Sequence, residues 1–135
     1  MVNGGRKEMG TKKSALHKLV MKYVGEEFES SIGETPQFKS FAMEFKKALK
    51  ADAKEAGLEI VDFSKGHFYC SAFVLREDGK MFYICIWDVR MKSVREKQMW
   101  RCAKDERDFT GGQNHYDYIE NIMEDIVNCQ RHDRS

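Results

Sequence analysis

An Asp-Gly pair between two apolar runs constrains this chain more than any other feature of its sequence. The runs lie within Gly66–Arg90, in the stretch GHFYCSAFVLREDGKMFYICIWDVR, and they flank Asp78-Gly79. Both central residues of a type I′ turn need a positive φ, which Asp and Gly tolerate, so the pattern predicts a β-hairpin. A two-residue turn pairs Leu75 with Phe82. Both faces of this hairpin are largely apolar, so we expect both to be covered.

Helical periodicity lies on both sides of the hairpin. Apolar residues recur at helical spacing in four segments, so we expect helices over about 13–28, 36–56, 93–106 and 116–129. Thr35-Pro36 is typical of a helix start, and Gly57 of a helix end. The alternating run 58–63 predicts a first strand. The element order ααβββαα predicts an α+β fold, in which helices cover a three-stranded antiparallel meander.

The length of the chain, 135 residues, is typical of one domain. We expect a mobile N-terminal arm over 1–10, a single α+β domain over 11–130 and a polar tail over 131–135. The net charge of +1 argues against a bulk binder of polyanions. No apolar run approaches the roughly 20 residues of a membrane helix. We therefore expect a cytoplasmic protein without a membrane partner.

One candidate binding site lies at the open end of the hairpin, opposite its turn. The predicted register gathers His67, Asp88 and Arg90 there, beside Tyr69. A Gly-Gly loop could approach them and hold an anion with its backbone N–H groups. The alternative is a polar rim in which an aspartate and an arginine form an ordinary ion pair. The loop residues are Thr110, Gly111, Gly112, Asn114 and His115.

A second candidate site is a zinc centre. Cys70 and Cys85 are diagonal neighbours on one face in the predicted register, and Cys129 and His132 are three residues apart near the last helix. Three thiolates and one imidazole form a common tetrahedral Zn²⁺ site. Alternatively, the cysteines are free thiols that fill the core, as cytosolic cysteines often do. No zinc-ribbon spacing occurs in the sequence.

Two further function classes follow from charge and motifs. Lysines and arginines gather within 46–54 and 92–104, which is compatible with binding DNA or RNA, but acidic residues interrupt both runs. Short signatures of nucleophilic, phosphate-binding and dinucleotide-binding enzymes are missing from the sequence. We therefore expect a protein that is not an enzyme.

Three segments resemble a known group of proteins. They are DFSKGHFYCSAF (Asp62–Phe73), WDVR (Trp87–Arg90) and AKDERDFTGGQNHY (Ala103–Tyr116). They resemble small accessory proteins carried by phages, prophages and plasmids of Firmicutes, over roughly Phe38–Tyr116. Where those proteins have Ser in the third strand, this chain has Cys85 or Trp87.

The resemblance implies a function of the counter-defence type. Several small proteins of this origin are anti-CRISPR inhibitors that bind a Cas nuclease such as Cas9 and block the loading of nucleic acid. The implied partner is a host nuclease or defence protein, met in the cytoplasm of the bacterial host. The alternative is a DNA- or RNA-binding accessory protein, stabilised by zinc if the cysteines hold a metal.

Overall fold

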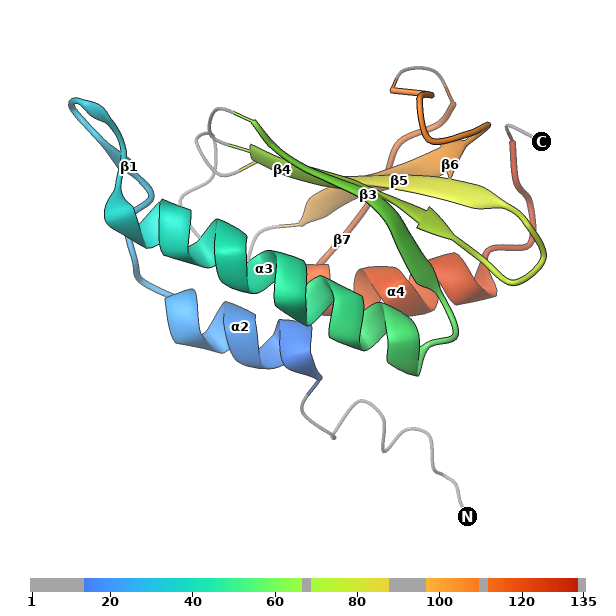
Figure 1. The fold of residues 1–135 in the computed structure, drawn as a ribbon, viewed down its shortest axis with the longest axis horizontal. Coiled ribbons are helices and arrows are strands. Elements are labelled where there is room, and N and C mark those ends of the chain that lie inside the picture. Colours follow the sequence, from blue (N-terminus) through green and yellow to red (C-terminus); the bar gives the residue numbers. More distant parts are fainter. Residues whose placement is uncertain (1–13, 67–68, 88–96, 110–111, 134–135) are drawn as a thin grey trace, which may run out of the picture.

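The computed structural model describes residues 14–66, 69–87, 97–109 and 112–133, and it confirms the α+β class (Figure 1). The helices in these ranges are α2 (Ala15–Tyr23), α3 (Pro36–Glu55) and α4 (Ile119–Asn128). A small hairpin consists of β1 (Glu29–Ser30) and β2 (Gly33–Glu34). The main strands are β3 (Glu59–Gly66), β4 (Tyr69–Leu75), β5 (Met81–Trp87), β6 (Gln98–Ala103) and β7 (His115–Asp117). The predicted arm over 1–10 lies outside the described residues.

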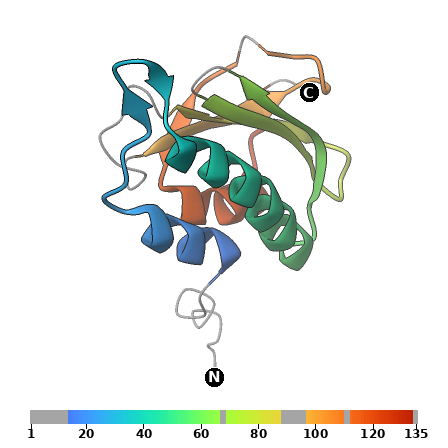
Figure 2. The ribbon, with the colours of Figure 1, turned by 60° about the vertical axis from the view of Figure 1, so that its left-hand side comes forward.

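The main sheet has five strands in the order β3-β4-β5-β6-β7, and every neighbouring pair is antiparallel. The prediction of a three-stranded meander is therefore wrong in strand number. The sheet extends through β6 and β7, in a part of the chain where the sequence predicts a helix and a loop. Figures 1 and 2 show the helices on one face of the sheet, with α2 packed against both α3 and α4.

Helix α3 begins and ends as the sequence predicts. The Thr35 hydroxyl accepts a hydrogen bond from the Phe38 N–H at 3.2 Å, and Pro36 occupies the first helical position. Gly57 follows the helix with a φ of +77°. The Leu58 N–H then donates back to the Ala53 carbonyl at 2.7 Å, which closes the turn as in a Schellman motif.

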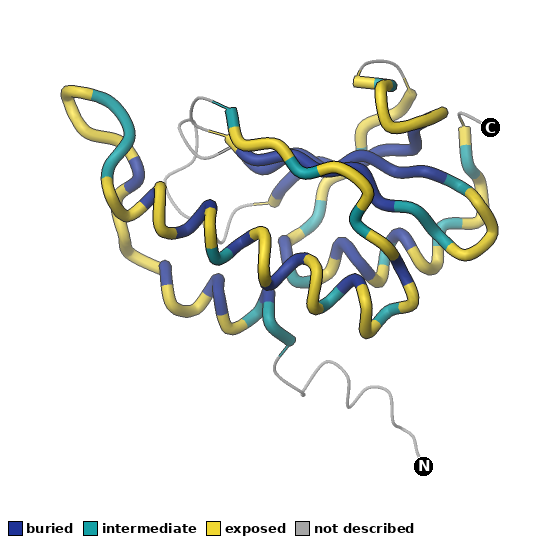
Figure 3. The backbone as a smooth tube through the Cα atoms, viewed as in Figure 1, coloured by how far each residue is buried: buried dark blue, intermediate teal, exposed yellow. Residues whose placement is uncertain are grey.

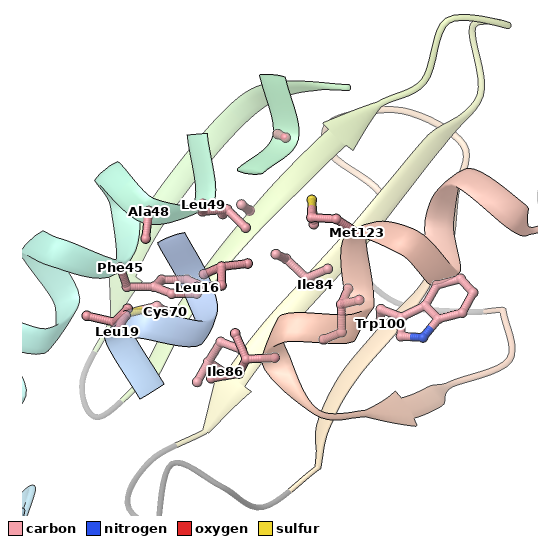
Figure 4. Close-up of a cluster of buried hydrophobic side chains, with 14 of the residues drawn as sticks. Leu16, Leu19, Phe45, Ala48, Leu49, Cys70, Ile84, Ile86, Trp100 and Met123 are labelled. Carbon is pink, nitrogen blue, oxygen red and sulfur yellow. The ribbon is translucent and has the colours of Figure 1, made fainter. Parts of the chain in front are cut away.

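The main core lies between the sheet and the helices (Figure 4). Phe38, Phe41 and Phe45 of α3 are each fully buried. At about 2 kcal/mol for each buried phenylalanine, α3 contributes strongly to this layer. Figure 3 shows that buried residues lie along the central strands and that exposed residues lie on the outer sides of the helices.

The β4–β5 hairpin forms, but its register differs by one residue from the prediction. Leu75 pairs with Met81 rather than with Phe82. Such a shift moves every side chain of one strand to the other face of the sheet. Phe82 and Ile84 therefore lie in the helix-side core, whereas the sequence predicted them on the same face as Leu75, which packs on the opposite side of the sheet.

The reason is the length of the turn. The Arg76 N–H donates to the Lys80 carbonyl, and the Gly79 N–H donates to the Arg76 carbonyl. Gly79 has a φ of +87°. The loop Glu77–Gly79 is thus a type I turn followed by a left-handed glycine, which is the usual three-residue hairpin connection, and not a two-residue type I′ turn.

Strand β6 replaces the helix that the sequence predicts over 93–106. All six of its residues are buried, so both faces are covered and no apolar–polar alternation is visible. The spacing of Met99, Trp100 and Ala103 imitates the stripe of a helix. The last predicted helix, 116–129, is present as α4, but it starts three residues later, after β7.

The face of the sheet opposite the helices carries a second, smaller core. Its buried members are Phe73, Met81, Tyr83, Cys85, Met99 and Ala103. The Phe109 ring lies 5.1 Å from the Phe73 ring and 5.9 Å from the Tyr83 ring. Arg101 is buried here and stacks over Tyr83 at 4.4 Å. The expectation that both hairpin faces are covered is therefore met.

Candidate functional site

A hollow of about 400 Å³ opens to solvent where the end of α4 meets β6 and β7. Its walls combine aromatic, carboxyl, amide, thiol and guanidinium groups. The lining residues are Trp100 of β6, His115 of β7, Asp125 and Asn128 of α4, and Cys129, Gln130 and Arg131 after α4. Small-ligand sites typically join an aromatic wall to a few convergent polar groups, so we treat this hollow as the candidate site.

Strand pairing builds the aromatic wall. Trp100 and His115 are direct partners in the β6–β7 ladder. Their rings stack with centroids 4.5 Å apart and planes 29° from parallel. The indole is buried and belongs to the main core beside α4 (Figure 4), whereas the imidazole is half-buried. The main core therefore supports the Trp100 side of the stacked pair, and the His115 side is partly exposed to solvent.

A pair of carboxyl groups joins β7 to α4 beside the wall. Burial, a hydrogen bond with Asp117 and the negative charge of Asp117 raise the pKa of Asp125 to about 7. Burial opposes ionisation of Asp117 too, but hydrogen bonds from Asp125 and Asn121 and the Tyr118 N–H lower its pKa overall. The two carboxyls therefore share one proton near neutral pH, held mainly by Asp125.

The backbone supports this arrangement locally. The Tyr118 N–H donates to Asp117 at 2.7 Å, and the Asn121 amide donates to the same oxygen at 3.2 Å. The first donor is the backbone of the residue that precedes α4 and the second is a side chain of its first turn, so Asp117 fixes the corner between β7 and the helix. The acceptor capacity that remains on Asp117 faces Asp125.

The predicted anion site is described only in part. His67, Asp88, Arg90, Thr110 and Gly111 lie outside the described residues. Of the other loop residues, Gly112 and Asn114 are exposed, and His115 is the only one that lines the hollow among the described members. In the observed register Tyr69 pairs with Trp87, whereas the sequence paired it with the following residue.

The structure separates the cysteines that the sequence brings together. Cys70 lies in the helix-side core and Cys85 in the opposite core, because of the register shift. Cys129 instead neighbours Cys102, whose pKa is raised to about 12 by burial and by that thiol.

His132 contacts strand β5. Its Nε2 is 2.7 Å from the Met81 carbonyl oxygen, and its ring packs edge-on against Phe82. Because a carbonyl only accepts, Nε2 carries the proton and donates it. Within the described ranges, no three cysteine, histidine or acidic side chains gather in a way that could hold a metal ion.

Sequence reasoning missed most of the hollow. Asp117 and Asp125 stand eight residues apart and meet only because β7 turns directly into α4. Asn128 and Arg131 carry no distinctive pattern in the sequence. Of the predicted anion-site and zinc-site residues, His115 and Cys129 line the hollow, and they were predicted for different sites.

Comparison of the chain with protein-family models, with curated proteins and with solved structures gave no match. The resemblance to accessory proteins of phages and plasmids therefore remains a prediction. Among the described helices, none is long and apolar enough to cross a membrane.

Proposed function

We propose that this chain is a non-enzymatic interaction protein of a phage or other mobile element, which inhibits a Cas9-type nuclease in the cytoplasm of the bacterial host. The observation that carries this proposal is an acidic, tyrosine-bearing surface at the start of α4. We call it the β7–α4 edge, and it consists of Tyr116, Asp117, Tyr118, Glu120 and Glu124, of which Asp117 and Glu120 are half-buried and the others are exposed. It lies next to the hollow described above.

The composition of the β7–α4 edge suits a protein interface. Tyr116 is 53% exposed and Tyr118 is 40% exposed. Tyrosine is enriched at interface centres because it offers a large apolar surface and a hydroxyl together. Glu120 and Glu124 are one helical turn apart and lie on the same side of α4.

Carboxylates at this surface would favour a basic partner. A nuclease that holds guide RNA and target DNA must present a positively charged channel. An acidic edge that enters the channel competes with the nucleic acid phosphates for the same lysines and arginines. Electrostatic complementarity of this kind speeds encounter and makes binding sensitive to salt.

The experiment measures inhibition and binding with purified proteins. A Cas9-type nuclease is mixed with this protein before or after guide RNA is added, and cleavage of target DNA is followed. We expect inhibition to be stronger when the protein is added first. Affinity for the nuclease without nucleic acid is measured in parallel, at two salt concentrations.

Matched charge reversals then locate the surface. The double variant E120K/E124K reverses two charges one turn apart on α4, and K46E/K50E does the same on α3. We expect E120K/E124K to weaken binding at least tenfold and K46E/K50E to leave it unchanged or stronger. Equal effects of the two variants, or no binding to the nuclease in any order of addition, would reject the proposal.

A second candidate function is binding of nucleic acid by α3. Five lysines are exposed along this helix: Lys39, Lys46, Lys47, Lys50 and Lys54. A row of lysines could neutralise several phosphates along one strand. In that case K46E/K50E, and not E120K/E124K, abolishes binding to DNA or RNA, and the affinity falls steeply as salt rises.

A further inference from the structure

The hollow beside α4 has the polar groups of a base-recognition site. Asp125 and Asn128 are three residues apart on α4 and both line the hollow, so their side chains lie on neighbouring parts of its wall. Carboxyl and amide groups are the side chains that read the hydrogen-bonding edges of bases. His115 is half-buried on the aromatic wall, where a planar ring can stack.

A charged side chain at the rim of the hollow is suited to the phosphate of a nucleotide. Arg131 is exposed and lines the hollow on the side of the chain that leaves α4. A guanidinium at that position suits a phosphate, because its donors match phosphate oxygens in pairs. The hollow, with a volume of about 400 Å³, is shallow and open to solvent, so it would contact one face and edge of a base and leave the rest of the nucleotide in water.

We propose that this hollow binds a nucleotide, whose base stacks beside His115 and is read at its edge by Asp125, with the phosphate at Arg131. This site goes beyond the proposed inhibition of a nuclease, because it lies beside the β7–α4 edge and uses different side chains. The failure of either proposal leaves the other intact.

The carboxyl chemistry of Asp125 decides which base fits. An ionised carboxylate offers two acceptors, which match the adjacent N1–H and N2–H donors of guanine. A protonated Asp125 donates its proton to Asp117, so it offers the hollow an acceptor alone and matches the guanine edge less well. Because the pKa of Asp125 is raised to about 7, the affinity for guanine should rise as the pH increases through neutrality, whereas adenine and cytosine gain no matching donor at low pH.

The charged groups around Asp125 determine how easily its carboxyl group ionises. Asp117 faces it from β7 and Glu124 stands next to it on α4, and both disfavour its ionisation. Arg131 and, when protonated, His115 line the same hollow and have the opposite sign. From α2, His17 approaches Glu120 at 3.9 Å, more than a helical turn before Asp125. Lys97 acts on Asp117 and lowers the pKa of that carboxyl.

The experiment is an NMR titration of the full chain with GMP, AMP and CMP at pH 6 and pH 8. We expect GMP to shift the Trp100 indole and His115 signals with a dissociation constant of about 1 mM or tighter at pH 8. The affinity for GMP should fall several-fold at pH 6, whereas AMP and CMP should bind weakly at both pH values. A guanine-containing single strand tested beside GMP shows whether the source is nucleic acid or a free nucleotide.

Variants separate recognition from folding. The variant D125N carries an amide with a permanent donor and acceptor, so it should lose the preference for GMP at pH 8 and all pH dependence between the bases. The variant D62N changes an exposed carboxylate of β3, at the opposite edge of the sheet from β7, and should behave as the unmodified protein. Far-UV circular dichroism verifies the fold of both.

Several outcomes would overturn the nucleotide site. One is the absence of shifts at Trp100 and His115 with every nucleotide, and another is an affinity for GMP that does not depend on pH in the unmodified protein. The titration is repeated with N-acetyl-arginine amide, which imitates an arginine of a protein partner. Binding of this compound without binding of any nucleotide would assign the hollow to a protein contact instead.

Discussion

The Arg76 guanidinium donates a hydrogen bond to the Cys129 carbonyl at 2.7 Å, across 53 residues of sequence. The same Nη1 donates to the Ile126 carbonyl at 2.7 Å. Asp78 holds the other side of the guanidinium in a paired contact with Nε and Nη2. The turn of the β4–β5 hairpin therefore caps the C-terminus of α4, where a positive charge is favoured by the helix dipole.

Replacement of Arg76 tests this cap. The variant R76M keeps much of the aliphatic stem but removes the donors, and it should lower the free energy of unfolding by about 2 kcal/mol. Lysine has a point charge and cannot bridge both carbonyls and Asp78, so R76K should fall between the two. Urea unfolding at neutral pH measures the three proteins. An R76M variant as stable as the unmodified chain would show that the cap contributes nothing.

A second cross-chain cap holds α2. The Asp52 carboxylate of α3 accepts hydrogen bonds from the Ala15 N–H at 2.9 Å and the Leu16 N–H at 3.0 Å. These N–H groups belong to the first turn of α2 and have no partner inside that helix. The variant D52A should cost about 1–2 kcal/mol in unfolding free energy. As a control, D62A removes an exposed carboxylate of β3 and should change stability by less than about 0.5 kcal/mol.

Hydrogen exchange distinguishes the loss of this cap from a general loss of stability. In D52A the amides of α2 should exchange much faster than those of β4 and β5, because α2 would open locally. Equal acceleration in the helix and in the sheet would contradict the local role of Asp52.

The join between β3 and β4 depends on the absence of a side chain at Gly66. Gly66 pairs with Tyr69, and a Cβ at Gly66 would overlap the Tyr69 ring. The variant G66A should therefore displace the ring and cost about 1 kcal/mol, measured by urea unfolding. In a Y69A background the same substitution should cost almost nothing. An equal cost in both backgrounds would mean that the backbone, and not the ring, opposes the extra methyl group.

Local signals in the sequence predicted the elements that rest on local chemistry. Thr35-Pro36 and Gly57 bound α3 as expected, because capping depends on residues within one turn. The register of the hairpin was wrong because Asp78-Gly79 fits two turn lengths, and only the strand pairing decides between them. The resulting shift of one residue in the register places Cys70 and Cys85 on opposite faces of the sheet.

Longer-range features could not be predicted in this way. Strand β6 carries Gln98 and Arg101 among apolar residues, and both polar side chains are buried. Arg101 is accommodated by the Tyr83 ring at 4.4 Å and by the Asp108 carbonyl at 3.1 Å, which come from different elements. The hollow also depends on the β6–β7 pairing. Because the sequence predicts a helix over 93–106, it could not reveal this hollow.

The carboxyl pair of Asp117 and Asp125 predicts an unusual dependence of stability on pH. The pKa of Asp125 is raised to about 7 in the folded chain from an ordinary value of 3.8, mainly by burial and by Asp117. Between these two values the folded state binds more protons at Asp125 than the unfolded state does. The stabilisation from this group is therefore fully present below about pH 4 and is lost as the pH rises towards 7.

Asp117 acts in the opposite sense. Its pKa is lowered in the folded chain, so its contribution is present above its ordinary value of 3.8 and is lost only as the pH falls further. Between pH 5 and pH 8 the effect of Asp125 should therefore dominate the pair. The variant D125N cannot titrate, and its unfolding free energy should change less between pH 5 and pH 8 than that of the unmodified chain. The variant D62N, altered at an exposed carboxyl group of β3, should retain the original slope, and an unchanged slope in D125N would show that the shared proton contributes nothing to stability.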